Sequence, residues 1–114
     1  MRVVPELWPD VIGRFVAEME RVVAPGGVCV VIETLGTGAA RPEPPSDALG
    51  TYYEWLEREV GMTRRVLRTD FEFTDHEAAA RAMAPFFGDA IAARVRAERW
   101  SRIPEFTGLW SRRV

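Results

Sequence analysis

The stretch that decides the fold is AEMERVVAPGGVCVVIE, which runs from Ala17 to Glu33. Apolar residues recur at helical spacing from about residue 9 to residue 23 and form one stripe of a helix. A Pro-Gly-Gly turn at 25–27 ends that helix. The next five residues, 28–32, are all apolar and four of them are β-branched, without strict alternation. This run predicts a strand buried on both faces, as in a parallel sheet covered by helices.

The rest of the chain predicts further helices and strands in alternation. Residues 36–47 contain three prolines and two glycines, which indicates a loop. Thr74 and Glu77 have the spacing of a capping box that opens a helical region. The patterns predict, in order, a helix at 46–60, a strand at 65–73 with one exposed face, helices at about 75–86 and 89–99, and a strand at 105–113. We therefore expect residues 1–114 to form a single α/β domain with about three strands and flanking helices.

Composition and charge exclude several classes of protein. With 47% hydrophobic and 28% charged residues, the chain has the composition of a globular protein. All fifteen basic residues are Arg, and the first 57 residues are net acidic while the remainder is mildly basic. The pI of about 5.5 gives no indication of nucleic-acid binding. No apolar run approaches the roughly 18 residues of a membrane span, and no secretory signal is visible at the N-terminus, so we expect a cytoplasmic protein.

Three features that often carry chemistry have simpler structural interpretations here. Gly36-Thr37-Gly38 follows a strand, but position 41 is Arg and a Pro-rich loop follows, so a flexible loop is favoured over a phosphate cradle. His76 lies in the expected capping box, where exposed polar residues are typical. Cys29, the one cysteine, is expected to be a small buried hydrophobe. Cys29 and His76 are too few for a zinc site built from those residue types.

The best-placed polar residues stand at the carboxyl end of the first strand. Open α/β sheets bind ligands at that end, which makes Glu33 the candidate catalytic base and Thr34 a candidate substrate-binding residue; a strand end that simply turns into the loop is the alternative interpretation. Tyr52 and Tyr53 lie on the apolar stripe of the second helix, and Trp55 falls off that stripe beside the loop. Core packing explains much of Tyr52 and Tyr53. An aromatic side chain off the stripe, such as Trp55, is compatible with the lining of a small-molecule pocket or with contact to a partner surface.

Residues 17–33 resemble the helix, Pro-Gly-Gly turn and fifth strand of class I S-adenosylmethionine-dependent methyltransferases. The continuation through 33–38, Arg68-Thr69-Asp70 and 104–110 is also similar to that family. The resemblance covers nearly the whole chain but only the C-terminal half of the family's domain. It implies a partial Rossmann-like methyltransferase sheet, in which the strand at 105–113 runs antiparallel and lies between the strands at 28–34 and 65–73.

The resemblance also implies a methyl acceptor that is a small molecule, with S-adenosylmethionine as the donor. The family holds that cofactor through a Gly-rich loop and an acidic residue on its first two strands, and neither can be matched to this sequence. No cofactor-binding residue is therefore assigned.

Two function classes stay open: the acceptor-side half of a methyltransferase, or a non-catalytic interaction or dimerisation module derived from one. In either class the strand at 28–34 has an edge that the full fold would cover. We expect this edge to pair with a second copy or a complementary chain, or to cause aggregation.

Overall fold

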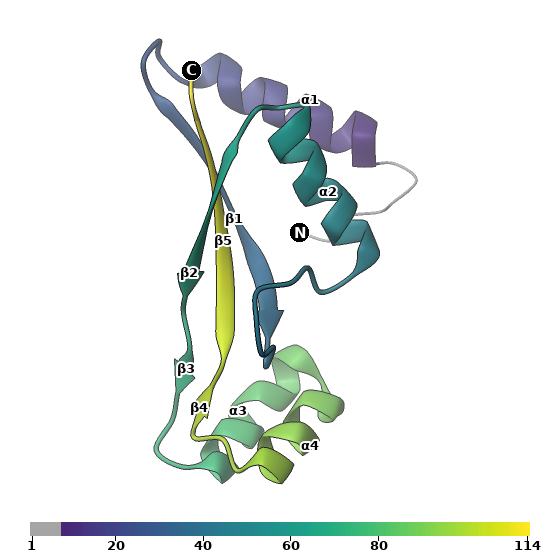
Figure 1. The fold of residues 1–114 in the computed structure, drawn as a ribbon, viewed down its shortest axis with the longest axis vertical. Helices are drawn as coiled ribbons and strands as arrows, with labels where there is room; N and C mark the ends of the chain where they lie inside the picture. The colour runs from purple at the N-terminus through teal and green to yellow at the C-terminus, as the bar shows by residue number, and fades with distance from the viewer. Residues whose placement is uncertain (1–7) are drawn as a thin grey trace.

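The computed structural model describes residues 8–114 as four helices, a three-stranded sheet and a separate two-stranded sheet (Figure 1). No helix within residues 8–114 is long and apolar enough to cross a membrane. The elements in chain order are α1 (Trp8–Val22), β1 (Val28–Thr37), α2 (Asp47–Arg58), β2 (Thr63–Arg68), β3 (Phe71–Glu72), α3 (His76–Phe87), α4 (Asp89–Glu98), β4 (Arg102–Ile103) and β5 (Glu105–Arg113).

The main sheet has the strand order β1-β5-β2. β5 pairs antiparallel with β1 from Val28 opposite Arg113 onward, and antiparallel with β2 from Thr63 opposite Ser111 onward. β1 and β2 therefore run in the same direction and do not pair with each other. This confirms the predicted order, in which the last strand is antiparallel and lies between the other two.

Helices α1 and α2 cover the same face of this sheet, on which the main core lies. The buried residues of this core come from both helices and from β1 and β5; they are Ile12, Val16, Cys29, Leu35, Tyr52, Tyr53, Leu56, Met62 and Trp110. Two ion pairs reach from the sheet to the helices at the margin of the core, Arg112 with Glu20 at 3.0 Å and Arg64 with Glu57 at 3.9 Å. We call this side of the sheet the helix face.

The opposite face of the sheet, which we call the open face, carries no helix among residues 8–114. Along β1, Val28, Val30 and Ile32 are 49%, 44% and 63% exposed, whereas Cys29 between them is 2% exposed. The prediction that this strand is buried on both faces is therefore wrong. An unbroken apolar run does not distinguish a strand covered on both sides from one whose second apolar row stays uncovered.

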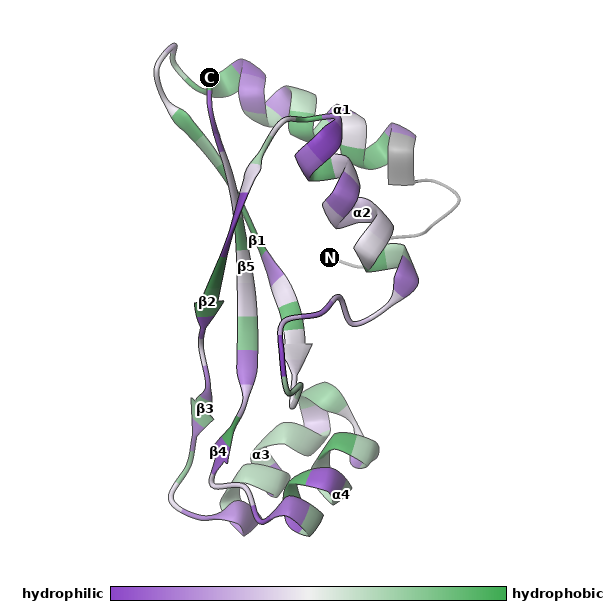
Figure 2. Cartoon of the chain, in the orientation of Figure 1, coloured by the Kyte–Doolittle hydropathy of each residue, from purple (hydrophilic) through white to green (hydrophobic). Residues whose placement is uncertain are grey.

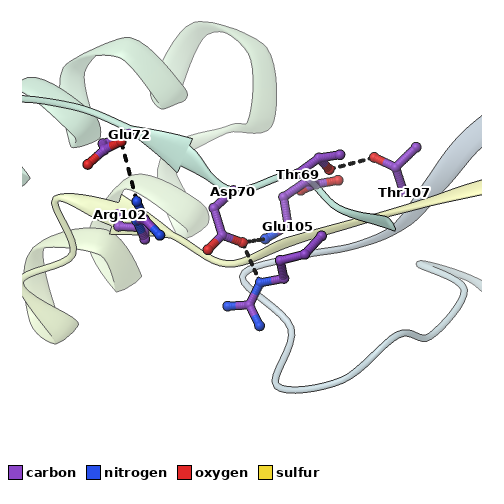
Figure 3. A network of polar contacts seen from close by, with 7 residues as sticks. Thr69, Asp70, Glu72, Arg102, Glu105 and Thr107 are labelled. Atoms are coloured by element: carbon purple, nitrogen blue, oxygen red, sulfur yellow. Dashed lines mark hydrogen bonds and ion pairs between the residues drawn. The ribbon is translucent and has the colours of Figure 1, made fainter. Parts of the chain in front are cut away.

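The strand predicted at 65–73 is divided in the structure. β2 ends at Arg68 and β3 begins at Phe71. Between them, an Asp70 carboxylate oxygen accepts the Glu105 backbone N–H at 3.0 Å and the Arg68 side chain at 2.5 Å (Figure 3). A side chain thus takes over a hydrogen bond that the strand ladder would have made, and the chain leaves the main sheet at this point.

Residues 71–103 form a second, smaller unit at one end of the sheet (Figure 1). Its core consists of residues of α3 and α4 packed on Ile103 of β4; they are Ala79, Ala80, Met83, Ala92 and Val95. The two helices match the predicted pair at 75–86 and 89–99 closely. The cap differs, because Asp75 rather than Thr74 is the N-cap of α3 and accepts the Ala78 N–H at 2.7 Å.

Gly108 provides a test of the packing on the helix face. A Cβ atom at this position would stand 2.4 Å from the Trp110 ring and 2.9 Å from Leu35. We expect Gly108→Ala to destabilise the protein by about 1–3 kcal/mol, because both neighbours are fully buried.

The matched control is Gly50→Ala in α2, where the new Cβ would meet Pro44 at 3.5 Å, an ordinary contact. Inside a helix this change is expected to stabilise by about 0.5–1 kcal/mol. Urea denaturation of both variants measures the difference. Equal stability of the two would contradict the packing described for β5.

Candidate functional site

The helix face at the carboxyl end of β1 brings a carboxylate and two tyrosines together. Glu33 follows Cys29 and Val31 on alternate positions of β1 and so faces the helices. α2 crosses this end of the strand and contributes Tyr52 and Tyr53, whose rings lie 5.6 Å apart. The sequence predicted this grouping.

Tyr53 fixes α2 to the end of β1. Its hydroxyl donates a hydrogen bond to the Thr34 carbonyl at 2.7 Å, and its ring packs against Trp110 with 4.5 Å between centroids. One side chain therefore connects the helix to the outer edge of β1 and to the central strand. This contact sets the position of Tyr52 and Glu33 relative to each other.

Burial raises the pKa values of the Glu33 carboxyl and of the Tyr52 and Tyr53 hydroxyls. Burial raises the pKa of the Glu33 carboxyl above its ordinary value. Burial, with the nearby negative charge of Glu33 as a second cause, raises the pKa of Tyr52 to about 12 and raises that of Tyr53 as well. Both phenols therefore stay protonated at neutral pH, and the carboxylate is a stronger base than an exposed one.

The other two predicted site residues lie in different surroundings. The Thr34 side chain points to the open face, where its hydroxyl donates to a Glu105 carboxylate oxygen at 2.9 Å. Trp55 stacks with Tyr52 at 6.5 Å between ring centroids and lies against Gly13 of α1. Thr34 therefore contacts the candidate site through its backbone carbonyl, which accepts the Tyr53 hydroxyl. Trp55 contacts the site through the ring of Tyr52.

An open pocket of about 650 Å³ lies beside this group, between α2, the Pro-rich loop and β2. Its lining carries charges of both signs, including Glu57, Arg58 and Arg64. Of the five predicted site residues, Tyr53 lines it. A pocket of this size accommodates a small organic molecule.

Glu105 is a polar residue of the structure that sequence reasoning missed. It is 6% exposed at the start of β5, and one of its carboxylate oxygens, Oε2, is buried without a hydrogen-bond partner among the described residues. The surrounding polar network includes Asp70 and the hydroxyl pair Thr69–Thr107 at 2.6 Å (Figure 3). Its only sequence signal is the two-residue spacing from Thr107, which places both on the open face.

The glycine turn at 36–38 is occupied by contacts with other residues of the chain. The Gly38 N–H donates to the Pro104 carbonyl at 2.7 Å, so it is not available to a phosphate. Gly38 adopts a φ of 70°, and a Cβ there would lie 3.3 Å from the Trp100 ring. This supports the loop interpretation over a nucleotide cradle.

Neither the cysteine nor the histidine joins the candidate site. Cys29 is buried in the main core, and His76 begins α3 in the smaller unit. In the described part of the chain, no three His, Cys, Asp or Glu side chains are grouped so that they could hold a metal ion.

Comparison of this chain with protein-family models, with curated proteins and with solved structures gives no match. The functional argument therefore depends on the geometry described above.

Glu33→Gln tests the burial of the carboxylate. Because the folded protein binds this proton more tightly than the unfolded chain, ionisation of Glu33 reduces stability as the pH rises through its raised pKa. We expect the variant to have a higher melting temperature than the wild type at pH 7 and nearly the same one near pH 4.

Glu18→Gln is the contrasting variant. A side-chain hydrogen bond from Arg21 lowers the pKa of Glu18, so its loss is expected to lower, not raise, the melting temperature at pH 7. Both changes are followed by thermal denaturation across the pH range. A Glu33→Gln variant less stable than the wild type at pH 7 would contradict the assignment.

Proposed function

We propose that this chain supplies the acceptor side of an S-adenosylmethionine-dependent methyltransferase fold. The observation that supports the proposal is the strand order β1-β5-β2, with an antiparallel strand between two strands of the same direction. The resemblance of the sequence implies this uncommon order, and local patterns alone do not. The remaining strands of the fold would continue from β1.

In this proposal Glu33 is the base that removes a proton from the methyl acceptor. Its raised pKa brings the carboxyl closer to the neutral range in which general bases work. Tyr52 and Tyr53 stay protonated; Tyr53, whose hydroxyl is bonded to the Thr34 carbonyl, contributes ring surface to the acceptor pocket, and Tyr52 packs beside it. Thr34 and Trp55 act as positioning residues, because they hold Tyr53 and Tyr52 respectively.

The described residues do not fit S-adenosylmethionine by themselves. The glycine turn after β1 is engaged by Pro104 and Trp100, and no other Gly-rich turn follows a strand in residues 8–114. In the proposed enzyme another segment of polypeptide holds the cofactor. Methyl transfer requires donor and acceptor in line, so the two parts must meet at the carboxyl end of β1.

A second candidate is a non-catalytic interaction module derived from the same fold. The observation that favours it is the extent of uncovered apolar surface. Besides the open face of β1, the α1 residues Val11, Phe15 and Val22 are exposed on a helix whose other side packs on the core. Surfaces of this kind mark interaction sites.

Calorimetric titration with S-adenosylmethionine and S-adenosylhomocysteine separates the two candidates. We expect the 114-residue chain alone to give no binding heat with either compound. A second polypeptide is made that also includes the residues encoded in frame by the DNA directly upstream. We expect this longer polypeptide to bind S-adenosylhomocysteine. Absence of a strand with a Gly-rich turn from that extension, together with no binding, would favour the interaction module.

Turnover measurements test the role of Glu33. In the completed enzyme, Glu33→Gln is expected to lower kcat by about 10²-fold or more, the usual contribution of a general base. His76→Ala is the control, since His76 begins α3 in the smaller unit, outside the candidate site. Equally small effects of both substitutions would show that Glu33 is not the base.

A further inference from the structure

The outer edge of β1 has a defined set of hydrogen-bonding groups. The Val114 N–H donates to the Gly27 carbonyl at 2.8 Å, so Gly27 faces β5. Because backbone groups alternate in direction along a strand, Cys29, Val31 and Glu33 also face β5. The N–H and C=O groups of the intervening residues, Val28, Val30 and Ile32, therefore point outward.

At both ends of this β1 edge the backbone groups already have hydrogen-bond partners within the chain. The next outward residue is Thr34, and its carbonyl accepts the Tyr53 hydroxyl at 2.7 Å. At the other end the chain turns, with the Gly26 and Gly27 N–H groups bonded to Val114 and Ala24. Three consecutive outward residues remain without a partner in the part of the chain that the structure describes, and Val30 is the central one.

The two edges of the main sheet differ in charge. β1 is uncharged from Val28 to Ile32, and its hydrophobic segment is visible in Figure 2. β2, at the other edge, has Arg at three of its six positions. Charged edge strands resist pairing with another chain, whereas flat apolar ones favour it. If another chain adds to the main sheet, we therefore expect it to pair with the β1 edge and not with the β2 edge.

We infer that β1 pairs antiparallel with β1 of a second copy of this chain, with Val30 opposite Val30 of the second copy. In this register Val28 lies opposite Ile32 of the second copy, so every outward group meets another outward group. Six inter-chain hydrogen bonds form, two for each of the three outward residues. The product is a continuous six-stranded sheet with two-fold symmetry.

Charge and side-chain placement agree with this register. Glu33 of one copy lies opposite Gly27 of the other, so the two carboxylates stay apart. The side chains of Val28, Val30 and Ile32 from both copies meet on the open face, where all three are exposed in the single chain. Cross-strand pairs of β-branched residues stabilise neighbouring strands by about 0.2–1 kcal/mol each.

The contact is small, since a five-residue strand pairing buries less than the standard interface of about 800 Å² per partner. We therefore expect a weak dimer, formed at protein concentrations of about 100 μM and largely dissociated well below that. The inference depends only on the uncovered β1 edge of the 114-residue chain; in a completed methyltransferase fold the remaining strands would occupy that edge in place of a second copy. Cysteine cross-linking detects such a complex.

Val30→Cys is the diagnostic variant. Opposite residues of a hydrogen-bonded antiparallel pair have Cα atoms about 5.5 Å apart, within the range that a disulfide spans. We expect this variant to form a covalent dimer with oxidised glutathione at about 100 μM protein, at least about tenfold faster than Ile32→Cys. Two copies of Ile32→Cys would place their sulfur-bearing residues about 13 Å apart along the strands, beyond disulfide reach.

A mixture of Val28→Cys and Ile32→Cys chains fixes the register. We expect these two to cross-link with each other and neither with itself. The native Cys29 is buried on the helix face and serves as the unmodified background. Circular dichroism of each variant confirms that it folds as the wild type does.

Two results would overturn the inference. Equal cross-linking of Val30→Cys and Ile32→Cys would indicate collision or aggregation without a register. No cross-linking of any variant, with a monomeric mass by light scattering at about 100 μM, would show that the edge is covered by something other than a second copy. A failed cofactor titration has no bearing on either result, so this proposal and the methyltransferase proposal can fail separately.

Discussion

The structure depends on the insertion of β5 between β1 and β2. These two strands do not pair with each other, and all their sheet hydrogen bonds within the described residues go to β5. β5 also supplies Trp110, which is fully buried beneath α2. The last strand in the sequence therefore joins the first strand, the second strand and the helix layer.

Helices α1 and α2 cover only one face of the main sheet, so the candidate site and the uncovered apolar residues lie on different sides. The helix face holds the candidate site, where Tyr53 ties α2 to the end of β1 and burial raises the pKa of Glu33. The open face and the β1 edge hold the uncovered apolar residues. The candidate site on the helix face and the uncovered strand edge beside it are the two features from which the proposals are argued. The methyltransferase proposal places further strands along the β1 edge, whereas the dimer proposal places a second copy of the chain there.

Much of this arrangement can be predicted from the sequence. Helical spacing and turn residues place all four helices within one or two residues, and the resemblance places β5 between its neighbours. Glu33, Tyr52 and Tyr53 come together as expected, because the stripe of α2 must pack on the strand that precedes it.

The predictions that were wrong or incomplete concern contacts between residues that are distant in the sequence. The run Val28–Ile32 shows that a strand is apolar on both sides, but not whether anything covers the second side. Asp70 interrupts the strand at 65–73 because Glu105, which is distant in sequence, offers an N–H to it. Glu105 itself is buried by the junction of β5 with the smaller unit. No neighbouring residue in the sequence signals that burial.

The central claim is that β1 is an edge strand, bonded to β5 on one side and uncovered on the other. Amide hydrogen exchange, measured residue by residue by nuclear magnetic resonance in a dilute sample, tests this most directly. The account predicts alternating protection along β1, with slow exchange at Cys29, Val31 and Glu33 and fast exchange at Val28, Val30 and Ile32. Uniform slow exchange across these six amides in a monomer would contradict it.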